Sequence, residues 1–148
     1  TLEGGGQIIK TALALSSLTN KQFEAFKIRY LRKISGLKAQ HIHCVKALER
    51  STNAKAKNAV IGSEILTYEP GELKGQTITS DIGTAGSISL LLQSLLRPCT
   101  FSNEKTTLKI TEGTSGKWAM PYDFFANVLI PQIKKYEYCI CFDYYLEN

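Results

Sequence analysis

The sequence predicts an α+β protein in which helices cover one face of a mixed β-sheet. Apolar residues recur at three- and four-residue spacings in several segments, and β-branched residues bounded by turn signals fill the segments between them. The order helix, strand, helix, strands is followed by helix, strand, helix, strand. Because no linker rich in Pro, Gly or Ser divides the 148 residues, we expect one body built from similar units.

The first predicted helix covers residues 7–18, where a helical apolar pattern follows three glycines at 4–6. Residues 22–28 alternate in part between apolar and polar side chains and predict a strand. Residues 29–36 are expected to be a basic loop, and residues 37–51 have the apolar spacing of a second helix. The chain therefore begins with the order helix, strand, helix.

Two strands are predicted next, over residues 58–71 and 75–81, because β-branched residues flank a Pro-Gly turn. Residues 84–98 return to a helical spacing. Thr84 is a candidate N-cap of this helix, and Pro98 is expected to close it.

The last predicted elements are a strand over residues 106–114, a helix over residues 121–136 and a final strand over residues 136–148. The helix starts with a proline, which suits a first helical turn. Pro131 lies inside it and predicts a kink or a break, because proline has no N–H to donate to the preceding turn.

Composition limits the class of protein. A hydrophobic content of 43% argues for a folded chain, and a net charge of +5 favours polyanions such as RNA without requiring one. The longest apolar stretch is much shorter than the roughly 20 residues of a membrane span, so no membrane helix is expected. No signal peptide is visible, and we expect an intracellular protein; Thr1 in place of a start methionine suggests missing upstream residues.

The four cysteines have no zinc-ligand spacing, so free and partly buried thiols are the first expectation, with disulfides second and zinc third.

The glycines at 4–6 match neither a P-loop nor a dinucleotide fingerprint, since no lysine-serine or lysine-threonine pair follows and Ile9 stands where the last fingerprint glycine would be. Two interpretations are left. One is a simple flexible turn. The other is a helix N-terminus whose amides bind an anion, with the preceding Glu3 holding a divalent metal against it.

The basic loop is a second candidate site. Arg29, Arg32, Lys33 and Lys38 lie within a short segment that runs into the second helix, and arginine binds phosphate oxygens in pairs. An ordinary solvated basic surface is the alternative. Two of the chain's four arginines lie here, which favours phosphate binding.

Polar side chains in the helices are further candidates. Gln40 and His41 start the second helix, and His43 follows; with no evident carboxylate partner, a hydrogen-bonded structural role for the histidines is favoured over catalysis. Gln93 interrupts an apolar run, so it either faces a cleft or forms the polar edge of a helix.

Five stretches together carry a resemblance to a known family. In chain order they are EGGGQIIKTALALSSLT, IRYLRKISGLKAQH, IGSEILTYEPGELKG, DIGTAGSISLLLQSLL and WAMPYDFF. Their order and spacing resemble the N-terminal half of RNA 3′-terminal phosphate cyclases, over residues 2 to about 145.

The resemblance implies an ATP-dependent reaction helped by Mg²⁺ or Mn²⁺. In the family a histidine attacks the α-phosphate of ATP, AMP passes from that histidine to the RNA 3′-phosphate, and the ribose 2′-hydroxyl then closes a 2′,3′-cyclic phosphate and releases AMP. The implied partners are RNA 3′ ends and ATP. The implied compartment is the nucleus in a eukaryote and the cytoplasm in a prokaryote.

The same resemblance assigns residues on the nucleotide side. Glu3 is similar to the family's metal-proximal glutamate, and Gln93 to the glutamine that contacts ATP. Met120 occupies the place of a proline that packs near the nucleotide.

On the RNA side, Arg29 and Arg32 resemble the family's paired arginines, for which RNA-phosphate binding is implied. Gln40 and His41 match its glutamine-histidine pair beside them. Lys10 stands where the family usually has an arginine, which keeps the positive charge but loses the planar fork.

The family fold repeats a unit of two helices on a four-stranded sheet, similar to the C-terminal domain of translation initiation factor three. By this resemblance the first repeat covers about 1–83 and most of the second covers about 84–148, while an inserted domain and the C-terminal part are absent. The family's nucleophilic histidine lies in that absent part, and neither His41 nor His43 matches its motif. We therefore expect no self-adenylylation by this chain, and the remaining half of the protein as its partner.

The alternative is a non-catalytic cyclase-like protein that binds RNA or assists ribosome assembly. That branch loses the glutamate-glycine signature, which is intact here, so the enzyme is favoured.

Overall fold

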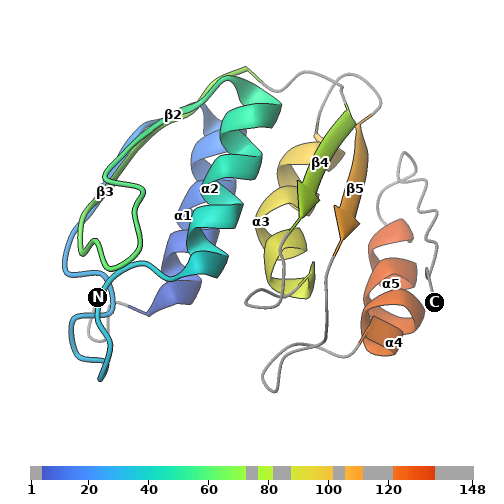
Figure 1. Cartoon of the computed structure of the whole chain (residues 1–148). Helices are drawn as coiled ribbons and strands as arrows, with labels where there is room; N and C mark the ends of the chain where they lie inside the picture. Colours follow the sequence, from blue (N-terminus) through green and yellow to red (C-terminus); the bar gives the residue numbers. More distant parts are fainter. Residues whose placement is uncertain (1–4, 73–76, 82–87, 102–105, 112–121, 136–148) are drawn as a thin grey trace.

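The structure is a computed structural model, and it describes residues 5–72, 77–81, 88–101, 106–111 and 122–135 (Figure 1). The elements of its first part are, in order, α1 (Gly6–Thr19), β1 (Phe23–Ala25), α2 (Ala39–Thr52), β2 (Lys55–Lys57) and β3 (Leu66–Glu69). The second part contains β4 (Thr77–Asp81), α3 (Ile88–Thr100), β5 (Thr107–Thr111), α4 (Tyr122–Phe124), the π-helical turn η2 (Phe125–Leu129) and α5 (Ile130–Lys134).

Two small sheets are present. The first has the order β1-β3-β2 with antiparallel neighbours, so that Phe23 of β1 and Ala56 of β2 both lie opposite Tyr68 of the central strand. The second sheet pairs β4 with β5 in parallel, with Thr77 opposite Thr107. The α+β class is therefore confirmed, whereas the described residues do not show the expected four-stranded repeat, which stays a prediction together with the two-repeat division.

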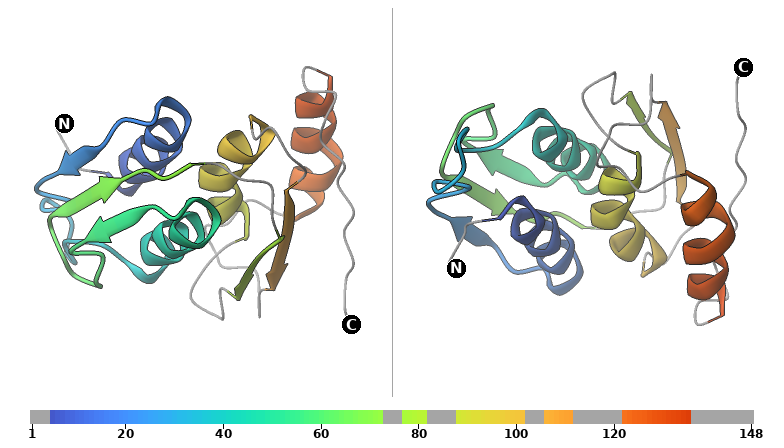
Figure 2. Two further views of the ribbon diagram at one scale, coloured as in Figure 1. Left: turned by 90° about the horizontal axis from the view of Figure 1, so that it is seen from above. Right: turned by 90° about the horizontal axis from the view of Figure 1, so that it is seen from below.

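The elements lie in successive layers (Figure 2). The three-stranded sheet is covered by α1 and α2, α3 packs on the other side of these two helices, and β4, β5 and then α5 follow beyond α3. Figure 1 shows that α1 and α2 begin at the same end of the layer, beside the loop that joins β1 to α2. This arrangement brings the first turns of two helices to one edge of the molecule.

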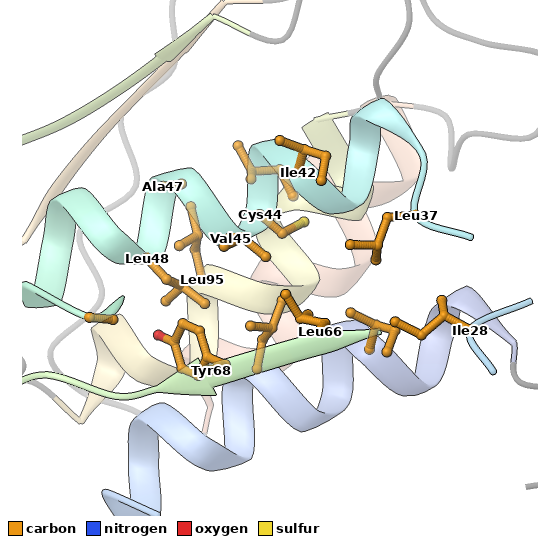
Figure 3. Packing of buried hydrophobic residues seen from close by; sticks show 14 residues of the cluster. Ile28, Leu37, Ile42, Cys44, Val45, Ala47, Leu48, Leu66, Tyr68 and Leu95 are labelled. Atoms are coloured by element: carbon orange, nitrogen blue, oxygen red, sulfur yellow. The ribbon is translucent and has the colours of Figure 1, made fainter. Parts of the chain in front are cut away.

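The main core lies between the first sheet and the helices, as Figure 3 shows. On β3, Leu66 and Tyr68 are buried while the residues between and after them are not, so alternate side chains of this strand face the helices. The Tyr68 hydroxyl shares a hydrogen bond of 3.0 Å with the Ser17 hydroxyl of α1, and burial raises the pKa of Tyr68. The core therefore ties α1 to the central strand by both apolar and polar contacts.

A second cluster joins α3 to the last helix. Leu92 and Leu96 of α3 pack with Ile130 of α5, and Leu108 and Ile110 of β5 lie against them. The π-helical turn η2 lies directly before α5, whose second residue is Pro131. A π-helical turn fits this position because a proline ring displaces the carbonyl of the preceding turn and has no N–H to donate to it. The predicted break of this helix is thus confirmed as a π-helical turn.

The predicted boundaries differ from the observed ones at several points. The strand expected over residues 22–28 is limited to β1, and that expected over 58–71 to β3. β2 was not predicted, because its sequence Lys-Ala-Lys has little β-branched character. Pro98 lies inside the last part of α3 rather than closing it. Thr84 and the final strand over 136–148 lie outside the described residues.

Among the described residues, no helix has the length and apolar character needed to cross a membrane. Cys44 and Cys99 are free thiols, as expected, and Cys139 and Cys141 lie outside the described residues.

Candidate functional site

The candidate site is built at the shared end of α1 and α2. Gly5 is the N-cap of α1, in an extended conformation, and its carbonyl accepts a hydrogen bond of 3.0 Å from the Ile8 amide. The other amides of a first helical turn have no partner within the helix and carry the positive end of its dipole. This end of α1 therefore has the electrostatics of an anion site.

His41 supplies a buried polar group to this end. Its side chain is fully buried, and its Nδ1 accepts a hydrogen bond of 2.9 Å from the backbone N–H of Lys38 at the start of α2. Because Nδ1 is an acceptor, the proton of the neutral imidazole lies on Nε2. Nε2 has no hydrogen-bond partner among the described residues.

Gly6 is the residue that faces this nitrogen. A Cβ placed on Gly6 would overlap Nε2 and Cε1 of His41, so only glycine lets the first turn of α1 lie against the imidazole. A Cβ on Gly5 would meet nothing. The donor of His41 is thus directed at the first turn of α1.

Positive charges surround the same imidazole. The pKa of His41 is lowered from 6.5 to about 4, first by burial and then by the charges of Lys10, Arg29 and Lys38. The ring is therefore neutral at pH 7 and acts as an N–H donor rather than as a cation. A buried neutral donor next to three cationic side chains suits the binding of an anion.

Lys10 lies one helical turn after Gly6 and is buried. Burial lowers the pKa of Lys10, and the nearby Cys44 of α2 acts in the opposite direction. Burial raises the pKa of Cys44, while the Ser94 side chain of α3 and the charge of Lys10 oppose that rise. The amine of Lys10 therefore lies in a poorly solvated space where an anionic ligand would stabilise its charge.

Arg29 and Arg32 lie in the loop before α2. Arg29 has a left-handed backbone (φ 55°) and donates a hydrogen bond of 3.2 Å from Nη1 to the carbonyl of Gly36. Gly36 also has positive φ, and a Cβ there would overlap the backbone of Gly62 in the facing loop. Arg29 is half-buried and Arg32 is exposed, so the structure brings Arg29 near His41 and leaves Arg32 at the surface.

The remaining predicted residues are distributed as follows. Gln40 is half-buried in the first turn of α2, beside His41 in the chain. Gln93 lies on α3, and its side chain lies outside what the structure describes. Glu3 and Met120 lie outside the described residues. No group of three His, Cys, Asp or Glu side chains in the described part could hold a metal ion, so the described donor set does not fit a metal by itself.

Two contacts of this site were not predicted from the sequence. The fit of Gly6 against His41 joins residues from two helices, and no local pattern shows it. The hydrogen bond from the Lys38 amide to Nδ1 of His41 is one of the two bonds of a capping box. Histidine here occupies position N3, where glutamate or glutamine is usual. The position of His41 on the same helical face as Val45 and Leu48 was a signal of its burial.

The fold and the site define an α+β protein whose first two helices meet at a positively charged end. The family model of RNA 3′-terminal phosphate cyclase matches residues 1–146. The chain belongs to this family, as its sequence motifs implied.

Archaeal relatives agree with this assignment. The RNA 3′-terminal phosphate cyclase of Pyrococcus furiosus is 44% identical over 133 residues, which is 90% of this chain and 39% of the relative. That of Archaeoglobus fulgidus is 41% identical over 90% of this chain and 40% of the relative. That of Caldivirga maquilingensis is 49% identical over 86% of this chain and 36% of the relative. The chain thus spans about two fifths of the length of these relatives.

Proposed function

We propose that this chain is part of an enzyme that converts an RNA 3′-terminal phosphate into a 2′,3′-cyclic phosphate at the expense of ATP, and that the end of α1 and α2 binds the RNA phosphate. The observation that carries the proposal is the buried Nε2–H of His41. It faces the first turn of α1 and lacks a partner among the described residues. A buried donor of this kind is costly unless a ligand satisfies it.

A phosphate group suits this donor, because its oxygens accept hydrogen bonds and the neighbouring side chains are cationic. Nε2–H of His41 and the first amides of α1 would donate to the phosphate oxygens. Arg29 and Arg32 would neutralise the remaining charge with paired N–H groups, and Lys10 would do so as a point charge. Because His41 is neutral, it orients the phosphate without taking part in proton transfer at pH 7.

The proposed reaction has three steps. A histidine outside this chain attacks the α-phosphorus of ATP, and pyrophosphate leaves. A 3′-phosphate oxygen then attacks the same phosphorus, which frees the histidine and links AMP to the RNA end. Finally the ribose 2′-oxygen attacks the RNA phosphorus, its proton leaves, and AMP departs as the cyclic ester forms. The residues of this chain hold and neutralise the phosphate through the last two steps.

ATP use follows from the family, and Gln93 and Met120 are proposed to lie on the nucleotide side. A divalent metal such as Mg²⁺ would depend on Glu3, which lies outside the described residues. The described side chains do not form a metal site by themselves.

The phosphate site can be tested by binding. We expect this chain to bind a single-stranded oligoribonucleotide with a 3′-phosphate at least about tenfold more tightly than the same RNA with a 3′-hydroxyl, since one hydrogen bond to a charged group is worth about 1.5–3 kcal/mol. His41→Ala should remove this preference. Fluorescence anisotropy at fixed ionic strength measures both affinities.

His43→Ala is the matched control, because His43 is half-buried on the same helix and has no part in the proposed site. Equal binding of the two RNAs by the unaltered chain would overturn the phosphate site. The non-catalytic alternative predicts the same binding, but it also predicts no AMP adduct after the downstream part of the protein is restored. Labelling with α-labelled ATP separates these two functions.

A further inference from the structure

A short segment beside the site, residues 26–34, exposes an unusual number of large apolar side chains. Phe26 is 62% exposed, Leu31 60% and Ile34 65%, and Tyr30 is 48% exposed. Ile28 between them is buried and anchors the segment in the core. We call residues 26–34 the aromatic-basic loop.

The exposed side chains are held on a defined backbone. The Ile28 amide donates a hydrogen bond of 3.0 Å to the Glu64 carbonyl in the facing loop, and the Gly36 amide donates one of 2.8 Å to the Ile28 carbonyl. Tyr30 and Arg32 donate to the carbonyls of Lys27 and Arg29 in two successive turns. The aromatic-basic loop therefore presents Phe26 and Tyr30 without a large further ordering cost on binding.

Cations alternate with the apolar residues of this loop. It contains Lys27, Arg29, Arg32 and Lys33, and no acidic residue. The Nζ of Lys27 lies 5.6 Å from the centre of the Tyr30 ring, an arrangement in which the aromatic face is already used by a cation. Phe26 has no such contact among the described residues, so its ring is the more available of the two.

The loop also leads directly into the proposed phosphate site. Arg29 lowers the pKa of His41 and so lies near it. Phe26 precedes Arg29 by three residues, which places the two Cα atoms within about 11 Å of each other. Phe26 is therefore within reach of the nucleotides that adjoin a terminal phosphate bound at His41.

We propose that the aromatic-basic loop binds the bases of single-stranded RNA next to its 3′-terminal phosphate, with Phe26 as the main stacking platform and Tyr30 as the second. This inference rests on the proposed function, since that function places the RNA end at His41. Exposed aromatics interleaved with cations are typical of surfaces that bind single strands. The centre of a protein interface is instead depleted of lysine. Because stacking does not depend on base identity, the contact gives affinity without sequence preference.

The test compares Phe26→Ala with the unaltered chain on two RNAs that both end in a 3′-phosphate. One carries normal bases and the other is abasic at its last two nucleotides. We expect Phe26→Ala to weaken binding of the normal RNA by about tenfold and to leave binding of the abasic RNA unchanged. Phe26→Trp should retain the affinity for the normal RNA.

Phe101→Ala is the matched control, since Phe101 is 64% exposed just after α3, and it should change neither affinity. An equal effect of Phe26→Ala on both RNAs, or no effect on either, would overturn the inference. Loss of self-association in Phe26→Ala, measured by sedimentation with unchanged RNA binding, would assign the loop to a protein contact and would also overturn it. The preference for a 3′-phosphate over a 3′-hydroxyl, measured in the same titrations, reports separately on the proposed function.

Discussion

Gly6 at the start of α1 lies against the imidazole of His41 at the start of α2, so closely that a Cβ on Gly6 would overlap Nε2. This contact fixes the spacing of the two helix ends. It also keeps the Nε2–H donor beside the amides of the first turn of α1. The geometry of the candidate site therefore depends on having glycine, which has no side chain, at position 6.

Gly6→Ala tests that dependence. In an ordinary helix this change would stabilise the fold by reducing the freedom of the unfolded chain, but here the added methyl group displaces His41. We expect a loss of about 1–3 kcal/mol in the free energy of unfolding, as for other overpacked sites, together with weaker binding of the 3′-phosphate RNA. Urea unfolding and anisotropy measure the two effects. Gly5→Ala, where a Cβ meets nothing, should change neither by a comparable amount.

The pH dependence of stability should report the state of His41. Its pKa is about 4 in the folded protein against 6.5 for an unperturbed histidine, because of burial and the charges of Lys10, Arg29 and Lys38. Between these values the unfolded chain binds more protons, so stability falls as the pH is lowered from 6.5 to 4, by roughly 3 kcal/mol at most. His41→Gln should lose this component. The same pH profile of unfolding in both proteins would show that His41 is not buried in its neutral form.

Lys10→Met tests the cationic environment of the site. Removing this buried charge removes one of the effects that lower the pKa of His41, so the pKa should rise, as measured by NMR titration of the imidazole. Stability should change little, since the methionine has a similar shape and needs no hydration. The affinity for the 3′-phosphate RNA should fall several-fold and depend less on salt. Lys46→Met on the exposed face of α2 is the control, and an equal loss of affinity there would point to general electrostatics.

Tyr68→Phe separates the core from the site. It removes the hydroxyl that is 3.0 Å from the Ser17 hydroxyl and leaves that buried group without this partner. We expect a loss of about 1–2 kcal/mol in the free energy of unfolding, with unchanged RNA binding. Ser17→Ala combined with Tyr68→Phe should cost less than the sum of the two single changes. Full additivity would mean that the two hydroxyls do not interact.

Much of the secondary structure could be predicted from the sequence because it depends on local spacing. The apolar pattern after the glycines predicted α1, and that around His41 predicted α2. Pro131 predicted the break that the structure shows as a π-helical turn. β2 was missed because its three residues owe their conformation to pairing with β3 and not to their own propensity.

The residues of the candidate site were largely named in advance, but their arrangement was not. The family could be recognised without the structure, because its motifs follow one another in a typical order and spacing. The cationic loop with Arg29 and Arg32 and the glycines at 4–6 could be found in the same way, because each consists of neighbouring residues. The packed structure was needed to show that Gly6 contacts His41 across two helices and that Lys10 is buried beside Cys44. It was also needed to show that the Lys38 amide donates a hydrogen bond to Nδ1 of the imidazole. Those relationships depend on how α1 packs beside α2, and such packing between distant segments leaves no local pattern in a single sequence.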